Sequence, residues 1–172
     1  MCGRYSLRAE PEVIQQTFDL ETLPDDWSPR YNMAPTQPLP VITTAAPRQL
    51  SMLQWGLIPS WSRDPSVGSK LINARAETID EKPSFRESFQ RRRCLVPADG
   101  FFEWQSQGAS KRPMFVHLQD NALFAFAGLW DTWRDPSGQP ITSFTIITTT
   151  PNDVLRPLHH RMAVILDRQH YA

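Results

Sequence analysis

The sequence lacks the features that mark membrane, secreted and disulfide-stapled proteins. No stretch of its 172 residues approaches the roughly 18 apolar residues of a membrane span. The N-terminus has no basic segment followed by an apolar one, so a secretory signal is not indicated. Only two cysteines occur, Cys2 and Cys94, too few for a disulfide framework or a cysteine-based zinc site. We therefore expect a cytoplasmic protein, or a nuclear one if the source has a nucleus, without a membrane partner.

Net charge is also lacking, because 18 Lys and Arg balance 18 Asp and Glu. Binding to nucleic acid by bulk electrostatics is therefore not favoured. The charge is uneven along the chain: residues 63–115 hold ten basic and seven acidic side chains, a local excess of three positive charges. This segment fits either a local basic face or a solvated surface of mixed charge.

Proline is abundant, with 16 residues spread along the chain, and this dispersion excludes long helices. We expect a single α+β domain over residues 1–172, with a strongly bent, mostly antiparallel, barrel-like sheet and a few short helices. An apolar stripe of Val13, Ile14, Phe18 and Leu20 behind Pro11 predicts a helix over 10–20. Shorter helices are predicted over 82–91 and 151–156, and residues 23–40 are expected to be irregular or extended. The predicted strands are 40–44, 49–58, 94–98, 100–105, 113–119, 123–130, 143–150 and 163–166.

Cys2 becomes a 1,2-aminothiol once Met1 is removed. Its α-amine, with an ordinary pKa of about 8, is partly neutral at pH 7 and can attack an aldehyde to give an imine. The thiol can then close on the imine carbon to form a thiazolidine ring. Alternatively, the amine serves as the base for the thiol in an N-terminal-nucleophile hydrolase. A cysteine at position 2 without function is the plain alternative. For Cys94 we expect an ordinary buried thiol.

Two internal motifs carry further polar candidates. In LINARAET (71–78), an extended chain would put Asn73, Arg75 and Glu77 on one face, where an amide and a guanidinium can hold a hydroxyl or a phosphate. A surface Arg/Glu pair is the alternative. In ADGFFEWQ (98–105), strand alternation sends Glu103 away from Trp104, among aromatic side chains. A partly desolvated carboxylate there suits general acid–base chemistry, whereas an edge-strand glutamate facing solvent is the alternative.

A third motif, RPLHHRMAVIL (156–166), holds adjacent His159 and His160 before an apolar strand. A histidine can transfer protons near neutral pH. Adjacent residues of a strand face opposite ways, so the two form a poor metal pair, and we expect no metal and no cofactor. Phosphate-loop, dinucleotide, serine-hydrolase and zinc-finger motifs do not occur in the sequence.

Six segments in order, MCGRYS, YNMAPTQPLPVI, WGLIPSW, LINARAET, CLVPADGFFEW and LHHRMAVIL, resemble the SOS-response-associated peptidase (SRAP) family of abasic-site processing proteins. The resemblance spans essentially the whole chain. It implies the SRAP fold and a protein, acting in the DNA-damage response, that senses abasic sites in single-stranded DNA. Such a protein would bond its N-terminal cysteine to the opened sugar as a thiazolidine, by lyase-like Schiff-base chemistry. The peptidase label implies self-cleavage that removes Met1.

The resemblance also implies site residues. Cys2 would be the nucleophile, Asn73 would orient the sugar and the amine, and Glu103 and His159 would move protons. Further positions match family residues that contact DNA or support the site: Arg4, Pro35, Trp61, Arg75, Thr148 and Arg161. Stacking of bases on Trp61, about 1–3 kcal/mol per base, would offset the low net charge.

The chain departs from the family pattern in two places. Ala163 stands where the family has proline, and family members continue for several tens of residues beyond position 172. The resemblance therefore implies a domain without its C-terminal segment. We expect a monomer. Two other functions stay open: a thiol (auto)peptidase using Cys2 and His159, and a non-covalent reader of modified DNA.

Overall fold

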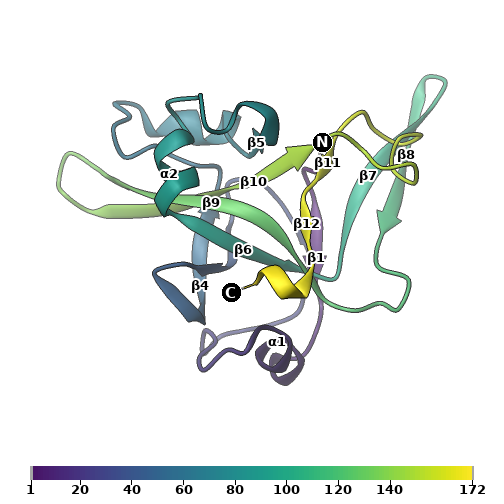
Figure 1. Cartoon of the computed structure of the whole chain (residues 1–172), viewed down its shortest axis with the longest axis horizontal. Helices are drawn as coiled ribbons and strands as arrows, with labels where there is room; N and C mark the ends of the chain where they lie inside the picture. The colour runs from purple at the N-terminus through teal and green to yellow at the C-terminus, as the bar shows by residue number, and fades with distance from the viewer. Residues whose placement is uncertain (1, 172) are drawn as a thin grey trace.

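Two β-sheets that contribute side chains to the same main hydrophobic core organise the chain in the computed structural model, which describes residues 2–171 (Figure 1). The predicted removal of Met1 therefore lies outside the described residues. The larger sheet runs in the order β11-β10-β4-β3-β6-β9-β12, and an additional pairing joins β10 to β9. This pairing closes five strands into a barrel: β3 (Pro38–Thr43), β4 (Ala46–Trp55), β6 (Arg93–Ala98), β9 (Phe124–Arg134) and β10 (Pro140–Thr149).

Short strands extend the barrel at both of its closing strands. β5 (Asn73–Arg75) and β11 (Met162–Ala163) pair with β10, and β12 (Ile165–Leu166) pairs with β9. The β5 and β4 pairings with β10 are parallel, whereas the other strand pairings given for the described residues are antiparallel. The predicted bent, barrel-like, mostly antiparallel α+β fold is confirmed.

The smaller sheet has the order β2-β1-β7-β8 and carries the N-terminus. Its strands are β2 (Arg30–Met33), β1 (Tyr5–Leu7), β7 (Gly100–Gln107) and β8 (Ser110–Val116). In Figure 1 the β7–β8 hairpin and the β9–β10 hairpin project from opposite sides of the molecule. The strand pairings place β1 inside its sheet, between β2 and β7, so the first strand of the chain is hydrogen-bonded on both of its edges.

An aromatic cluster joins the two sheets. Tyr5 of β1 meets Trp55 of β4 edge to face at 5.3 Å between ring centroids and Phe126 of β9 at 5.8 Å. Phe101 of β7 also contacts Phe126, at 5.7 Å. All four rings are at most 1% exposed. Burying each such ring stabilises the fold by about 1.5–3 kcal/mol, so the N-terminal strand is held firmly against the barrel.

The helices are short, as the prolines require. α1 (Pro11–Phe18) starts on Pro11 and ends at Asp19, whose φ of 53° lies in the left-handed region. Ile14 and Phe18 are buried, but Val13 is 47% exposed, so its predicted place in the apolar stripe is wrong. α2 (Arg86–Arg91) is shorter than the predicted 82–91. The part of the chain that the structure describes also holds three 3₁₀ helices: η1 (Pro65–Lys70), η2 (Ala76–Thr78) and η3 (Arg168–His170).

The helix predicted over 151–156 is wrong, because residues 153–158 form turns instead and residues 151–152 are irregular. Pro157 directly follows the predicted helix, and a proline cannot donate the backbone hydrogen bond that would continue a helix. Each predicted strand overlaps a strand of the structure, and β2 forms within the stretch expected to be irregular or extended. Among the described residues, no helix is long and apolar enough to cross a membrane.

Candidate functional site

The pairing of β1 with β7 brings Cys2 beside Glu103. Tyr5 pairs with Phe101, and the Phe102 N–H donates to the Arg4 carbonyl at 2.9 Å, so the chain before Tyr5 runs along the Glu103 segment. Cys2 is fully buried, and Glu103 is 2% exposed. Because β7 lies between β1 and β8, the alternative of an edge-strand glutamate facing solvent is wrong. The predicted alternation holds, since Trp104 is 37% exposed on the other face.

Burial changes the chemistry of the Cys2 thiol. Loss of hydration, together with the negative charge of Glu103, raises its pKa to about 12, although the Arg4 backbone N–H partly opposes this by hydrogen bonding. At neutral pH the sulfur is therefore a thiol rather than a thiolate. Cys94 is also buried, as expected, and burial raises its pKa as well. Neither cysteine has the environment of an activated thiolate nucleophile.

His159 lies in the turns between β10 and β11, not on a strand. Its ring stacks on that of His160 at 4.3 Å between centroids, so the expectation that the two rings face opposite ways is wrong. The Arg161 backbone N–H donates to Nδ1 of His159 at 3.0 Å. A neutral imidazole that accepts at Nδ1 carries its proton at Nε2. Burial lowers the pKa of His159, although the charge of Glu103 opposes this, so the neutral ring dominates at pH 7.

A groove of about 390 Å³ brings His159 and Glu103 together with Trp104 and Lys111. The sequence interpretation did not include Trp104 and Lys111 as site residues. Lys111 reaches the groove because the β7–β8 hairpin pairs it with Ser106. Gly108 lies in the turn of this hairpin with a φ of 61°. A glycine between two β-type runs is a sequence signal for a hairpin, and it could have indicated that Lys111 lies close to the Glu103 strand.

Asn73 begins β5 and carries a buried acceptor. Its Nδ2 donates to the Ile72 carbonyl at 2.9 Å, while within residues 2–171 its Oδ1 has no hydrogen-bond partner. The Ile72 carbonyl also accepts from the Trp55 ring N–H at 2.9 Å, and Trp55 packs on Tyr5 of β1. A buried acceptor without a partner is rare and fits a position that a ligand group completes.

Arg161 forms a clamp between three segments. Its Nη1 and Nη2 donate to Oε1 and Oε2 of Glu77 at 2.7 and 2.9 Å, and Nη2 also donates to the Thr148 carbonyl at 2.7 Å. The predicted Arg75–Glu77 surface pair is therefore not the main contact of Glu77. The Arg161 hydrogen bonds lower the pKa of Glu77 to about 2. Thr148, at 1% exposure, donates to the Ala74 carbonyl at 3.4 Å, so it is an internal residue in this structure.

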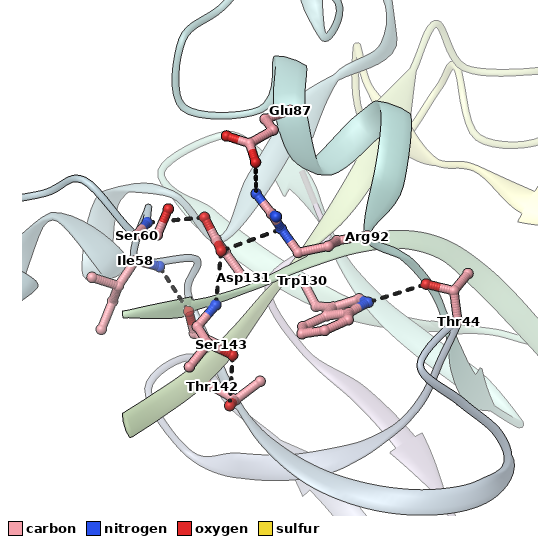
Figure 2. A network of polar contacts seen from close by, with 10 residues as sticks. Thr44, Ile58, Ser60, Glu87, Arg92, Trp130, Asp131, Thr142 and Ser143 are labelled. Atoms are coloured by element: carbon pink, nitrogen blue, oxygen red, sulfur yellow. Dashed lines mark hydrogen bonds and ion pairs between the residues drawn. The ribbon is translucent and has the colours of Figure 1, made fainter. Parts of the chain in front are cut away.

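Trp61 lies on a loop that hydrogen bonds fasten on both sides. The Ser60 N–H donates to Asp131 at 2.9 Å, and the Ser62 carbonyl accepts from the Trp133 ring N–H at 2.7 Å. Figure 2 shows Asp131 between Ser60 and Arg92, which lies 3.3 Å from the carboxylate. The Trp61 ring itself is 61% exposed, so the loop presents a fixed aromatic surface.

This loop begins at Gly56, directly after β4 ends at Trp55. The φ of 123° there is strained for any other residue, and a Cβ would stand 2.5 Å from the Gly68 carbonyl oxygen. A second groove, of about 450 Å³, follows the loop. Its lining includes Trp61, Arg63 and Lys70.

The remaining predicted residues lie at separate positions. Arg4 donates to Asn32 of β2 at 3.2 Å, and Arg75 is exposed at the end of β5. Pro35 is half-buried in the turn whose Thr36 N–H donates to the Trp55 carbonyl. Roles for these residues in binding stay predictions. Over residues 2–171, no group of three or more His, Cys, Asp or Glu side chains is arranged to hold a metal ion.

Comparison with known proteins gives one consistent result. A family model described as "SOS response associated peptidase (SRAP)" matches residues 1–172. The abasic site processing protein YoqW of Bacillus subtilis is 46% identical over 170 residues, which cover 96% of this chain and 76% of that protein. The abasic site processing protein HMCES of Xenopus tropicalis is 33% identical, with 97% and 63% covered. A crystal structure of a Bacteroides thetaiotaomicron protein superposes with a TM-score of 0.90 at 32% identity, covering 99% of this chain and 79% of that one.

Proposed function

Because the chain belongs to the SOS response associated peptidase (SRAP) family, we propose that it processes abasic sites in single-stranded DNA by bonding covalently to them through Cys2. The observation that carries the proposal is the position of Cys2: the second residue of the chain is buried beside Glu103, which shares a groove with His159. The relatives named as abasic site processing proteins support the substrate.

The first step uses the Cys2 amine. After Met1 is removed, the neutral amine attacks the aldehyde of the ring-opened deoxyribose, and the carbinolamine loses water to leave an imine. The amine, with an ordinary pKa of about 8, is available at neutral pH, whereas the thiol is fully protonated. This difference supports the order of amine first and sulfur second.

The second step closes the ring. The Cys2 thiol adds across the carbon–nitrogen double bond: a sulfur–carbon bond forms, the S–H bond breaks, and its proton ends on the nitrogen. The thiazolidine needs no oxidant and no cofactor, because every atom comes from the imine and the thiol. A protonated thiol suits this step, since it brings the proton that the nitrogen takes up.

Three side chains have proposed roles in these steps. Glu103 takes and returns the protons that the carbinolamine exchanges as water leaves. His159, with its proton at Nε2, donates a hydrogen bond to the sugar ring oxygen and stabilises the negative charge that develops there as the ring opens, and it assists reversal of the crosslink. Asn73 accepts a hydrogen bond from the sugar or from the Cys2 amine through its buried Oδ1.

The proposed DNA path uses stacking more than charge. Trp61 is exposed on a fastened loop and supplies a stacking face, with Pro35 as a wedge and Arg4 and Arg75 for phosphates. Arg161 and Thr148 are engaged internally, which supports the role of Arg161 in holding the site rather than the DNA. We propose that the protein acts as a monomer in the cytoplasm, or in the nucleus of a eukaryotic source.

A crosslinking assay tests the proposal. Met1-free protein is incubated with single-stranded DNA that holds one abasic site, and the products are separated after heating in detergent. We expect a heat-stable adduct that Cys2→Ala abolishes and Cys94→Ala retains, because Cys94 is the matched buried thiol. Absence of an adduct with the parent protein would refute the proposal. Binding that survives in Cys2→Ala without any adduct in the parent would instead indicate a non-covalent reader.

The family description also supports a second candidate, a thiol peptidase that cleaves Met1 with Cys2 and His159. The mass of the N-terminus, measured after expression in cells without methionine aminopeptidase activity, tests it. Loss of Met1 that stops in His159→Ala would support self-cleavage. Retention of Met1 in the parent protein would exclude it, and the raised pKa of the Cys2 thiol favours that outcome.

A further inference from the structure

Glu77 and Arg161 form a two-point ion pair that no part of the proposed reaction uses directly. Both carboxylate oxygens accept from the guanidinium, at 2.7 and 2.9 Å, and the two residues lie 84 positions apart in the sequence. The Arg161 residue is only 9% exposed. A planar, two-point pair of this kind fixes orientation as well as distance.

The same guanidinium is tied to the barrel. Nη2 donates to the Thr148 carbonyl at 2.7 Å and lies 3.3 Å from its Oγ1. Thr148 also pairs with Ala163 across β10 and β11. Two sets of contacts therefore hold Arg161: the hydrogen bonds of its side chain to Glu77 and Thr148, and the pairing of β11, which follows it, with β10. Together they fix the direction of its backbone N–H.

The backbone N–H of Arg161 is the hydrogen-bond donor to the His159 ring. It donates to Nδ1 at 3.0 Å, and the His159 N–H in turn donates to the Leu155 carbonyl at 2.9 Å. The protonated nitrogen of the neutral ring is thus decided by a hydrogen bond from Arg161. If the Arg161 N–H turned away, nothing would favour one tautomer of the neutral His159 ring, and its single proton could stand on either Nδ1 or Nε2.

We propose that Glu77 is a positioning residue, which through Arg161 holds the backbone N–H on Nδ1 of His159 and so keeps the ring protonated at Nε2. The inference rests on the proposed function, because the Nε2–H is the group that donates a hydrogen bond to the sugar. Glu77 itself touches neither the sugar nor Cys2 in this role. It acts on the rate of the reaction, and DNA affinity does not depend on it.

A double-mutant cycle tests this role. In single-turnover crosslinking at pH 7, Glu77→Ala should react about tenfold more slowly, below the 10²–10⁴-fold that full loss of a general acid–base group costs, because the imidazole is still present. In the His159→Ala background, Glu77→Ala should change the rate less than twofold, since its target is gone. Glu81→Gln, an exposed acid nearby, serves as the control and should react like the parent.

Two outcomes would overturn the proposal. Equal slowing by Glu77→Ala with and without His159 would show that it acts elsewhere. Tighter DNA binding by Glu77→Ala at an unchanged rate would show that Glu77 only withholds Arg161 from a phosphate. Glu77→Gln, which keeps the side-chain shape, repeats the cycle if Glu77→Ala does not fold.

A measurement without DNA separates this inference from the proposed function. The ¹⁵N chemical shifts of the His159 ring report which nitrogen carries the proton. We expect the Nε2–H form in the parent protein and a mixture of both forms in Glu77→Ala. If the parent makes no adduct, the proposed function fails, while the ring shifts still decide the positioning role. An unchanged Nε2–H form in Glu77→Ala would refute that role.

Discussion

The pH dependence of crosslinking should reveal which atom of Cys2 reacts first. Burial and the charge of Glu103 raise the thiol pKa to about 12 in the chain that carries Met1, and for any thiol pKa above 10 the thiolate fraction grows about tenfold per unit between pH 8 and pH 10. A mechanism that begins with thiolate attack would therefore accelerate about 100-fold between pH 8 and pH 10. The α-amine, with an ordinary pKa of about 8, is already half neutral at pH 8. If the amine attacks first, the rate should rise about twofold and then level off.

The assay is a single-turnover time course with Met1-free protein in excess over abasic single-stranded DNA, from pH 6 to pH 10. DNA without protein is followed at each pH, because abasic sites break in alkali. Circular dichroism confirms that the protein stays folded across the range. Cys94→Ala is the matched control and should give the same profile, since it retains Cys2. A tenfold rise for every pH unit up to pH 10 would refute the amine-first order and the role of the buried, protonated thiol.

Four other substitutions give separate expectations. Cys2→Ser should form an imine that borohydride traps but no heat-stable adduct, because a hydroxyl is a weaker ring-closing nucleophile; a heat-stable serine adduct would contradict the thiazolidine. Trp61→Ala should weaken binding of single-stranded DNA by about 1–3 kcal/mol per stacked base in fluorescence anisotropy, and unchanged affinity would remove Trp61 from the DNA path. The carboxylate of Glu77, with its pKa lowered to about 2, stabilises the fold above its unfolded pKa near 4.5 and loses this effect as the pH falls toward 2. The melting temperature of Glu77→Gln should therefore approach that of the parent between pH 5 and pH 2, and a constant difference would argue against the ion pair. Gly128→Ala should lower stability by about 1–3 kcal/mol in urea unfolding, because its Cβ would stand 2.8 Å from the Cys94 sulfur; a neutral result would mean that the barrel wall yields there.

The strands and the first helix could be predicted because their signals are local. Short runs of apolar, β-branched and aromatic residues mark β4, β6, β7, β9 and β10, and Pro11 marks the start of α1. The turns of 153–158 were missed because the apolar pattern takes no account of Pro157, which prevents a helix from continuing beyond residue 156. Closure of the barrel by β9 and β10 depends on pairing between strands, which local patterns do not contain.

The chemistry of Cys2 was readable in part from its place in the sequence. Position 2 is enough to predict an aminothiol, and the aromatic neighbours of Glu103 predict that its carboxylate is desolvated, which its 2% exposure matches. The raised pKa of the Cys2 thiol was not readable, because it arises from full burial and from the charge of Glu103 on a neighbouring strand. The stacking of His159 on His160 was missed for a related reason: the two residues lie in a turn, where strand alternation does not apply.

The sequence alone thus determined which residue types the site contains and the order in which the chain supplies them. The tertiary structure decided how they interact. Glu77 pairs with Arg161 across 84 residues instead of with nearby Arg75, and the Arg161 backbone selects the protonated nitrogen of His159. Such choices depend on which strands lie side by side, because hydrogen bonds and charges act over a few ångströms in space, whatever the distance along the chain.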